Sequence, residues 1–276
     1  MKKYVSLWIV ALAVILSVSP CFADKSGKTL MMATTTSTDN TGLLDYLAPY
    51  FTGDTGIELR WTAVGTGKAL RLGQNCDVDV LLVHAPAAEK QYLADSYGIN
   101  RCQVMYNDFV IIGPPEDPAG IAGKSVTGAM QAIAADKAVF ASRGDDSGTN
   151  KKEISLWNAA DMAVPEKSDW YRQTGQGMIA TINIAAEQDA YTMTDRGTYI
   201  KYSDNFNGNP PLKVLVEGDD VLKNQYSVIA VNPENCPDVN SAAATALADW
   251  LTSKKTQKRI GTFKLLGKKL FIPNAR

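Results

Sequence analysis

The stretch TLMMATTTSTDNTGLLDYLAPYF, residues 29–51, passes from an apolar strand pattern through a hydroxyl-rich segment into a helical pattern. Residues 29–33 have the apolar character of a strand, and Leu43, Leu44, Leu47 and Phe51 recur with the spacing of one helix face. Between them lie the consecutive hydroxyl residues TTTS, 34–37. A strand that leads into a helix through a polar loop is the building unit of an α/β fold.

A second polar stretch, SRGDDSGTN at residues 142–150, has the same setting, because it follows the strand-like run 138–141 and precedes a helical pattern. A junction of this kind turns backbone N–H groups outward, with the positive end of the helix dipole behind them, and so attracts anions. Arg143 adds one fixed cation with a planar fork of donors. The two stretches together predict an oxyanion bound between two lobes.

Strand and helix patterns alternate along the neighbouring chain. Residues 57–63 alternate as a strand, and the turn Gly65-Thr66-Gly67 precedes a short helix from Lys68. Residues 78–83 have the continuous apolar character of a buried parallel strand, and Pro86 opens the next helix. This alternation predicts an α/β fold with a parallel-rich sheet.

Two further apolar runs, 106–112 and 227–231, end at proline-containing turns and enclose a second alternating block. We expect them to be crossings between a lobe built from both ends of the mature chain and a lobe inserted in the middle. The expected division is 24–106 and 228–276 for lobe 1 and 107–227 for lobe 2. A cleft between two such lobes, lined by the carboxyl ends of strands, is where α/β folds bind ligands.

The first residues predict export. Lys2 and Lys3 precede the apolar residues 7–18, and small residues at 21 and 23 fit a signal peptidase, so we expect a signal peptide at 1–23 and a periplasmic protein. A membrane anchor would need roughly twenty apolar residues. A lipoprotein signal with Cys21 as the lipidated residue is the alternative, although the preceding proline fits it poorly.

The composition excludes several classes of protein. Removing Lys2 and Lys3 leaves 26 basic against 29 acidic residues, without a dominant Lys/Arg run, so nucleic acid is not an expected partner. The mature chain keeps Cys76, Cys102 and Cys236, which allow one disulfide and one thiol. We favour the pair Cys76–Cys102, although the sequence leaves the pairing open. The absence of a CxxC motif or a His/Cys cluster argues against residues that bind a metal cation directly.

Simpler interpretations exist for each polar motif. Residues 34–42 could be a loop in which Thr38 or Asp39 caps the following helix, although four hydroxyls exceed what capping needs. AVGTGKAL at 63–70 fails as a Walker loop, because Thr62 and Ala69 stand where Gly and Ser/Thr are required. It can still lend Thr66 and its neighbouring N–H groups to an anion.

A serine hydrolase is the remote alternative. Gly-Asp-Asp-Ser-Gly is similar to the nucleophile segment of trypsin-like proteases, and His84, Asp108 and Ser147 occur in the matching order. Against this, the protease motif has one Asp between its Gly and Ser, and its fold is all-β. A lone histidine at the end of an apolar strand is more often structural.

The mature chain resembles the periplasmic substrate-binding proteins of ABC transporters, specifically the tungstate-binding TupA family. The resemblance rests on TTTSTDNTGLLDYL (34–47), VGTGKAL (64–70), DVLLVHAP (79–86), MYNDFVIIGP (105–114), RGDDSGT (143–149) and TGQGMIATINIAAEQDAYTMTDRGTY (174–199). It implies oxyanion contacts by the following residues: Thr34, Thr35, Thr36, Ser37, Thr66, Arg143, Ser147, Gly148 and Thr149. Asn150 departs from the histidine of many family members.

The resemblance implies a two-lobed periplasmic-binding-protein fold of type II. It further implies a monomer that captures tungstate, and molybdate with it, for a membrane permease, with no enzymatic activity and no cofactor. Phosphate-binding proteins of the same fold share the spacing Arg-x-Asp-x-Ser-Gly-Thr, so they stay an alternative. Phosphate would need an acceptor for its proton, and Asp145 could serve.

Overall fold

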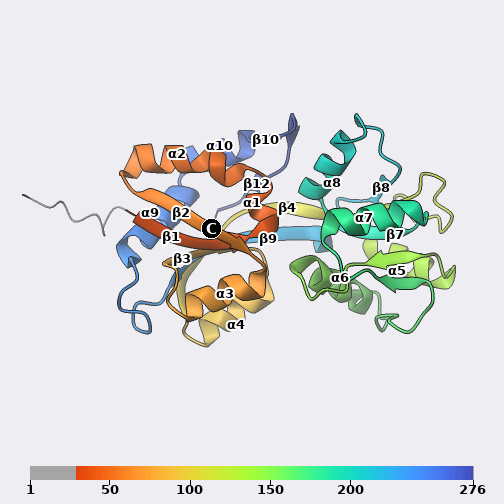
Figure 1. Ribbon diagram of the computed structural model, residues 1–276, viewed down its shortest axis with the longest axis horizontal. Coiled ribbons are helices and arrows are strands. Elements are labelled where there is room, and N and C mark those ends of the chain that lie inside the picture. The colour runs from red at the N-terminus through yellow and green to blue at the C-terminus, as the bar shows by residue number, and fades with distance from the viewer. Residues whose placement is uncertain (1–28, 276) are drawn as a thin grey trace, which may run out of the picture.

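The computed structural model describes residues 29–275, and these form two α/β lobes joined by two long strands (Figure 1). The predicted signal peptide at 1–23 lies outside the described residues. Ten strands make one sheet in the order β2-β1-β3-β9-β4-β7-β5-β6, with β8 and β12 (Ile272–Pro273) paired to β4. Two short strands, β10 (Lys264–Leu265) and β11 (Lys268–Lys269), form a separate sheet. The predicted two-lobed α/β fold is confirmed.

Lobe 1 contains the first strand-to-helix units of the chain. Its strands β1 (Thr29–Thr35), β2 (Glu58–Val64) and β3 (Val80–Val83) are parallel, as predicted, with β1 between the other two. Its helices are α1 (Thr36–Asp39), α2 (Leu43–Thr55), α3 (Thr66–Gln74), α4 (Pro86–Ala94), α9 (Ser241–Thr252) and α10 (Lys254–Thr262). Helix α3 begins at Thr66, two residues before the expected Lys68, so the Gly-Thr-Gly turn belongs to its first turn.

Lobe 2 is built from the middle of the chain. Its strands are β5 (Phe140–Ser142), β6 (Tyr171–Gln173), β7 (Tyr191–Asp195) and β8 (Lys213–Val216). Its helices are α5 (Val126–Ala135), α6 (Gly148–Ala159), α7 (Met178–Glu187) and α8 (Arg196–Asp204). Strand β5 runs parallel to both β6 and β7.

Strands β4 (Gly98–Gly113) and β9 (Lys223–Val231) pass between the lobes, with an antiparallel register from Gly98 to Asp108 on β4. The later part of β4 pairs instead with β7 and β8. The expected crossing runs, 106–112 and 227–231, lie within these strands. Strand β4 starts earlier than its apolar run, and its first half carries the polar residues Asn100, Arg101 and Gln103. Lobe boundaries at 106/107 and 227/228 stay a prediction.

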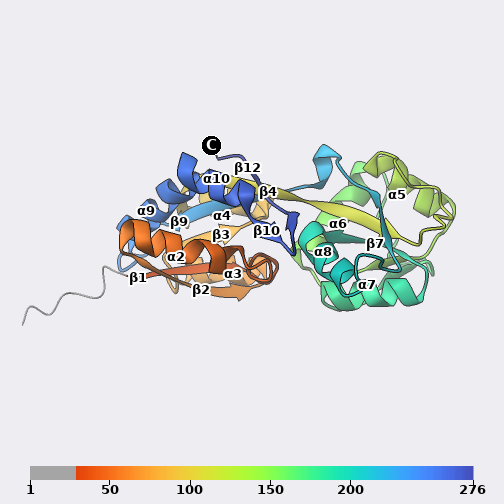
Figure 2. The same cartoon turned by 90° about the horizontal axis from the view of Figure 1, so that it is seen from above.

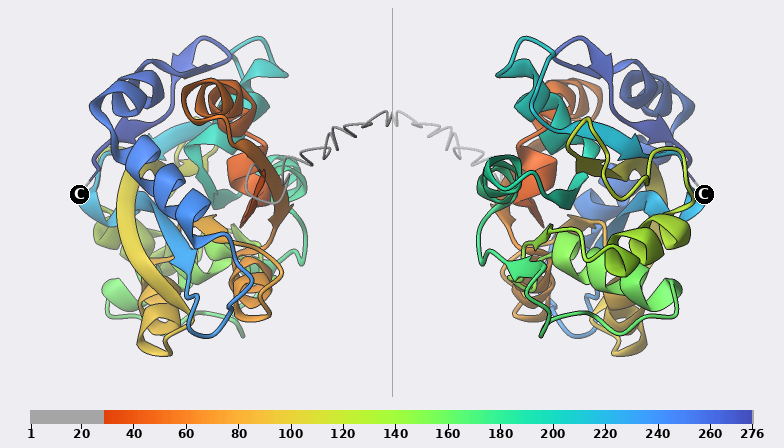
Figure 3. Two further views of the ribbon diagram at one scale, coloured as in Figure 1. Left: turned by 90° about the vertical axis from the view of Figure 1, so that its left-hand side faces the viewer. Right: turned by 90° about the vertical axis from the view of Figure 1, so that its right-hand side faces the viewer.

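Each lobe has its own aromatic core. In lobe 1 the rings of Phe51 and Trp250 meet edge to face at 5.4 Å, and in lobe 2 Phe140 and Trp157 do so at 5.5 Å. Burial of one such side chain stabilises the fold by roughly 1.5–3 kcal/mol. Figures 2 and 3 show helices on both sides of the strands in each lobe.

Among residues 29–275, a disulfide joins Cys76 to Cys236, which are 160 residues apart in the sequence, and Cys102 is left as the free thiol. The predicted pair Cys76–Cys102 is therefore wrong. Cys76 lies just before β3 and Cys102 lies on β4, and β9 separates these two strands in the sheet. Two strand spacings are about 10 Å, beyond the reach of a disulfide. The chain after β9 instead returns beside β3, where Val231 N donates to the Asp79 carbonyl at 3.0 Å.

Candidate anion-binding site

Helix N-termini from the two lobes meet at the predicted anion site. A methyl group added at Gly148 would lie 3.6 Å from Thr66 Oγ1 and 3.9 Å from His84 Cε1. The start of α6 in lobe 2 therefore faces the start of α3 and the end of β3 in lobe 1. The N–H groups of a helix's first turn have no partner within the helix, so both starts direct donors toward this junction. The structure thus brings together Thr66 and Gly148, which lie 82 residues apart.

The TTTS residues divide into two groups. Thr34 and Thr35 are buried at the end of β1, whereas Thr36 is exposed and Ser37 is partly exposed. The Thr34 hydroxyl donates to the Leu82 carbonyl at 2.8 Å and so ties β1 to β3. Thr35 Oγ1 accepts from Thr38 N at 3.2 Å and caps α1. The first two residues therefore support the segment, whereas the next two stay accessible.

The simpler interpretation, in which Thr38 or Asp39 caps the following helix, does not hold. Helix α2 starts after Gly42, whose φ of 74° places it in the left-handed region, and no side chain caps it. Asp39 instead accepts a hydrogen bond from Trp61 Nε1 at 2.6 Å. The polar segment contains a separate helical turn, α1, and this turn takes Thr35 as its cap.

His84 contacts the TTTS segment directly. Its Nε2 lies 2.9 Å from Thr35 Oγ1 and 3.1 Å from Ser37 Oγ, and its Nδ1 lies 2.9 Å from Asn224 Oδ1. The ring stacks on Tyr226, with 4.7 Å between centroids. From the sequence alone, His84 is either a structural residue or the base of a serine hydrolase. The sequence does place His84 at the carboxyl end of a buried strand, and the strand at residues 29–33 ends in hydroxyls. This shared setting could have indicated that the two segments meet.

Arg143 is held in a tight loop after β5. Its Nη2 donates to Asp145 Oδ2 at 2.5 Å, and Asp145 Oδ1 accepts from Ser147 N at 3.2 Å. Gly144 has φ 58°, and a methyl group there would lie 2.7 Å from Gln173 Cβ, so this turn requires glycine. Burial opposes ionisation of Asp145, but the Ser147 hydrogen bond and the Arg143 guanidinium outweigh it and lower the pKa of Asp145.

The Nε atom of Arg143 is buried and has no hydrogen-bond partner among the described residues. A buried, charged donor without an acceptor is costly, and such a donor is rarely left unpaired in a native protein. An acceptor from a ligand would satisfy it. This is the most direct sign that the loop is built to hold an anion.

A buried network behind the loop sets its shape. Glu153 accepts from Ser142 Oγ at 2.5 Å and from Tyr171 Oη at 2.7 Å, while burial raises the pKa of this carboxyl against these hydrogen bonds. Asn150 Nδ2 donates to Ser142 Oγ, and its Oδ1 accepts from Asp146 N. Asn150 therefore faces the loop interior and not the cleft. Ser147 Oγ caps α6 by accepting from Asn150 N at 3.3 Å.

The histidine and aspartate that a serine hydrolase would use have other hydrogen-bond partners in the structure. The His84 nitrogens contact Asn224, Thr35 and Ser37, as described above. Asp108 accepts two hydrogen bonds from Arg196, at 2.6 and 2.5 Å. This arrangement lacks the base-to-nucleophile and base-to-carboxylate contacts that a triad requires.

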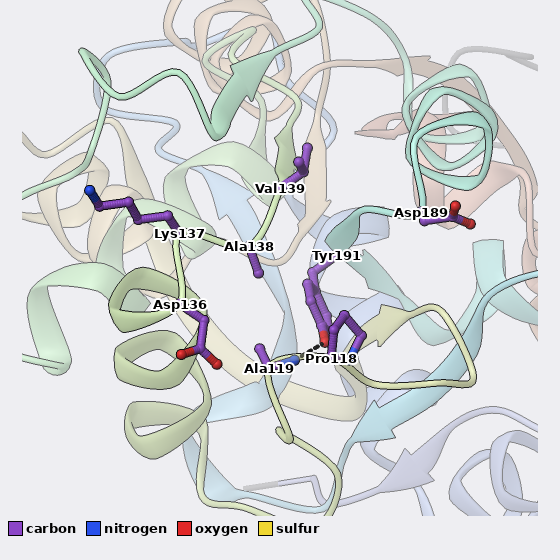
Figure 4. A pocket seen from close by; sticks show the side chains of 8 residues that line it. All are labelled: Pro118, Ala119, Asp136, Lys137, Ala138, Val139, Asp189 and Tyr191. Atoms are coloured by element: carbon purple, nitrogen blue, oxygen red, sulfur yellow. Dashed lines mark hydrogen bonds between the residues drawn. The ribbon is translucent and has the colours of Figure 1, made fainter.

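Other features of the described residues lie apart from this site. A hollow of about 590 Å³ in lobe 2 is lined by Asp136, Lys137, Asp189 and Tyr191, among others (Figure 4). It lies at the amino ends of β5 and β7, whereas Arg143 follows the carboxyl end of β5. Within residues 29–275 there is no cluster of His, Cys, Asp and Glu that could hold a metal ion, and no helix is long and apolar enough to span a membrane.

The single histidine of the chain provides a pH test of this geometry. Desolvation lowers the pKa of His84, against the raising effects of the Asn224 hydrogen bond and the Asp195 carboxylate. Near pH 6.5, His84 takes up a proton in the unfolded chain but not yet in the folded, ligand-free protein. The free energy of unfolding therefore falls as the pH drops below this value. Urea unfolding at pH 7.5, 6.5 and 5.5 should show a larger acid loss of stability for wild type than for His84→Gln, by up to about 1.4 kcal/mol per pH unit. Equal losses in the two proteins would contradict the desolvated placement of His84.

Comparisons with known proteins agree with the fold. A family model described as a PBP superfamily domain matches residues 23–255. The tungstate-binding protein TupA of Campylobacter jejuni is 50% identical over 240 residues, 87% of this chain and 89% of the relative. A solved tungstate-binding protein TupA from Desulfovibrio alaskensis G20 is 66% identical with a TM-score of 0.87, over 90% of this chain and 99% of that one. The solved tungstate ABC transporter protein from Geobacter sulfurreducens is 44% identical with a TM-score of 0.76, over 86% and 99% of the two chains.

Proposed function

Since this chain belongs to the TupA family within the PBP superfamily, we propose that it is the substrate-binding protein of an ABC transporter. It captures tungstate, and molybdate with it, in the cleft between the lobes and delivers the oxyanion to a membrane permease. The proposal includes export to the periplasm through the signal peptide at 1–23 and action as a monomer without enzymatic activity.

The buried, unpartnered Nε of Arg143 is the observation that carries this proposal. Tungstate is a tetrahedral dianion without a proton at neutral pH, so its site needs donors only. Arg143 supplies the full cation, and the starts of α3 and α6 supply outward N–H groups and roughly half a positive charge each. Together these balance the two charges of the ligand.

The donors that we assign to the oxyanion come from both lobes. Lobe 1 supplies the hydroxyls of Thr36, Ser37 and Thr66, and lobe 2 supplies Arg143 with the N–H groups of Gly148 and Thr149. Thr34 and Thr35 have a supporting role, because their hydroxyls make the internal hydrogen bonds described above. Ser147 acts through its cap on α6.

Closure of the lobes around the anion follows from this division. Neither lobe alone offers enough donors for a tetrahedral dianion, so the bound ligand favours the closed arrangement. Closing excludes water and strengthens each hydrogen bond to the ligand. Movement at β4 and β9, the two strands that join the lobes, then releases the ion to the permease.

The phosphate-binding alternative depends on Asp145. Both of its oxygens already accept hydrogen bonds, from Arg143 and from Ser147 N. Its lowered pKa keeps it ionised, so a bare dianion approaching it would be repelled, whereas hydrogen phosphate could donate a proton to it. The geometry favours Asp145 as the residue that orients Arg143.

Calorimetry with tungstate, molybdate, sulfate and phosphate tests this assignment, at constant ionic strength near pH 7. We expect tight binding of tungstate and molybdate with little heat from phosphate, and the same order of affinities in Asp145→Asn, because the preferred ligand carries no proton. Tight phosphate binding by wild type that is lost in Asp145→Asn would place the protein with the phosphate-binding proteins.

A further inference from the structure

A second contact between the lobes lies beside the anion site and is made by helix α8. Lys201 Nζ, on α8 of lobe 2, donates to the carbonyl of Asn40, the residue that ends α1 in lobe 1. Gly197, one turn earlier, packs against lobe 1 as well, since a methyl group there would lie 3.4 Å from Leu270 Cδ2 and 3.6 Å from Thr41 Cγ2. Figure 1 shows α1 at the edge of lobe 1 that faces α8.

Helix α8 is firmly anchored where it makes this contact. Its first residue, Arg196, binds both carboxylate oxygens of Asp108 on β4 and also Glu217, at 2.6 Å. Asp195 caps the helix by accepting from Thr198 N at 2.9 Å and Thr198 Oγ1 at 2.6 Å. Bidentate arginine–carboxylate pairs fix orientation as well as distance. Lys201 is therefore presented to lobe 1 from a fixed support.

On the lobe 1 side, the contact falls on the helical turn that carries the ligand hydroxyls. Helix α1 spans only Thr36–Asp39, with Asn40 N donating to the Thr36 carbonyl at 2.9 Å. Its first residues, Thr36 and Ser37, carry hydroxyls that we assign to the ligand, and the carbonyl of Asn40, directly after its last residue, accepts from Lys201. With an anion bound, lobe 2 would thus contact both ends of this helical turn: the first end through the anion and the last through Lys201.

We propose that Lys201 is a positioning residue for anion capture, acting as a latch that stabilises the closed arrangement through Asn40. This inference rests on the proposed function. The contact joins the two lobes, so their separation would break it, and it therefore stabilises the closed arrangement relative to an open one. Such a contact raises the apparent affinity by raising the closed population, and it does so chiefly through slower dissociation.

The test measures tungstate dissociation by stopped-flow tryptophan fluorescence for wild type, Lys201→Met, Lys201→Arg and Lys213→Met. Lys213 is the matched control, because its Nζ donates to Asn209 Oδ1 at 2.6 Å entirely within lobe 2. We expect Lys201→Met to raise the dissociation rate about three- to tenfold, the factor that corresponds to the loss of one hydrogen bond of ordinary net strength, with the association rate unchanged. Lys201→Arg keeps a cationic donor and should dissociate nearly as slowly as wild type.

A second measurement distinguishes the latch from a merely structural role of Lys201. Unfolding of the ligand-free protein should be similar for Lys201→Met and Lys213→Met, because each lysine makes one exposed hydrogen bond to an asparagine oxygen. Equal dissociation rates for these two variants would overturn the latch while leaving tungstate binding intact. Failure of wild type to bind tungstate would instead overturn the proposed function.

Discussion

Replacing Arg143 with alanine is expected to weaken tungstate binding by about 150-fold or more, the equivalent of about 3 kcal/mol. Arg143 is the residue that supplies a full cation to the assigned donors, and its side chain is only 19% exposed. Without it, a desolvated dianion would face helix N-termini and hydroxyls alone. Asp145, which Arg143 now neutralises at 2.5 Å, would also be left as an uncompensated carboxylate beside the ligand.

Arg143→Lys should bind with intermediate affinity, because lysine keeps the charge but loses the planar fork that lets Nε and Nη2 act together. Calorimetry with tungstate measures both variants. Arg172→Ala is the matched control, since Arg172 is an exposed arginine on the neighbouring strand β6, in register with Ala141. An affinity of Arg143→Ala within about threefold of wild type, less than roughly 1 kcal/mol, would show that the site is wrongly assigned.

Replacing Arg101 with methionine is expected to destabilise the fold by about 3–5 kcal/mol, because it leaves a buried carboxylate without its cation. The Glu89 side chain is fully buried, and Arg101, 16% exposed, pairs with it at 2.8 Å. Glu89 also accepts from Ala85 N at 2.6 Å, so it holds the backbone directly after His84 in the anion site. Urea unfolding at pH 7 measures the loss.

The pH dependence of this variant has a defined sign. Burial already raises the pKa of Glu89, against the lowering effect of Arg101, so removing Arg101 raises it further. Above about pH 4.3, Glu89 then holds a proton in the folded variant that it has lost in the unfolded chain. Part of the lost stability therefore returns as the pH falls. Arg60→Met is the control, because its pair with Glu58 has a similar distance of 2.9 Å but exposed side chains, and such pairs contribute little. Similar destabilisation by both substitutions would contradict the buried-charge explanation.

Much of the fold could be predicted because its signals are local. The apolar runs at β1, β3 and β9 and the helical spacing of Leu43, Leu47 and Phe51 depend on residues close together in the chain. The position of Arg143 between a strand and a helix also predicts an anion site without reference to any distant residue. The patterns that predict a strand or a helix follow from the hydrophobicity and backbone preferences of neighbouring residues.

The contacts that complete the site depend instead on residues far apart in the chain. His84 is 49 residues from Thr35, Lys201 is 161 residues from Asn40, and Cys76 is 160 residues from Cys236. Which hydroxyls of TTTS face inward was likewise set by the neighbour of β1, since Thr34 meets the Leu82 carbonyl of β3. The sequence by itself determined the alternation of elements and the chemistry of each loop, because these depend on local preferences. Only the tertiary structure decided which loops meet and which groups are already paired, because the order of strands in a sheet is settled by packing over the whole chain.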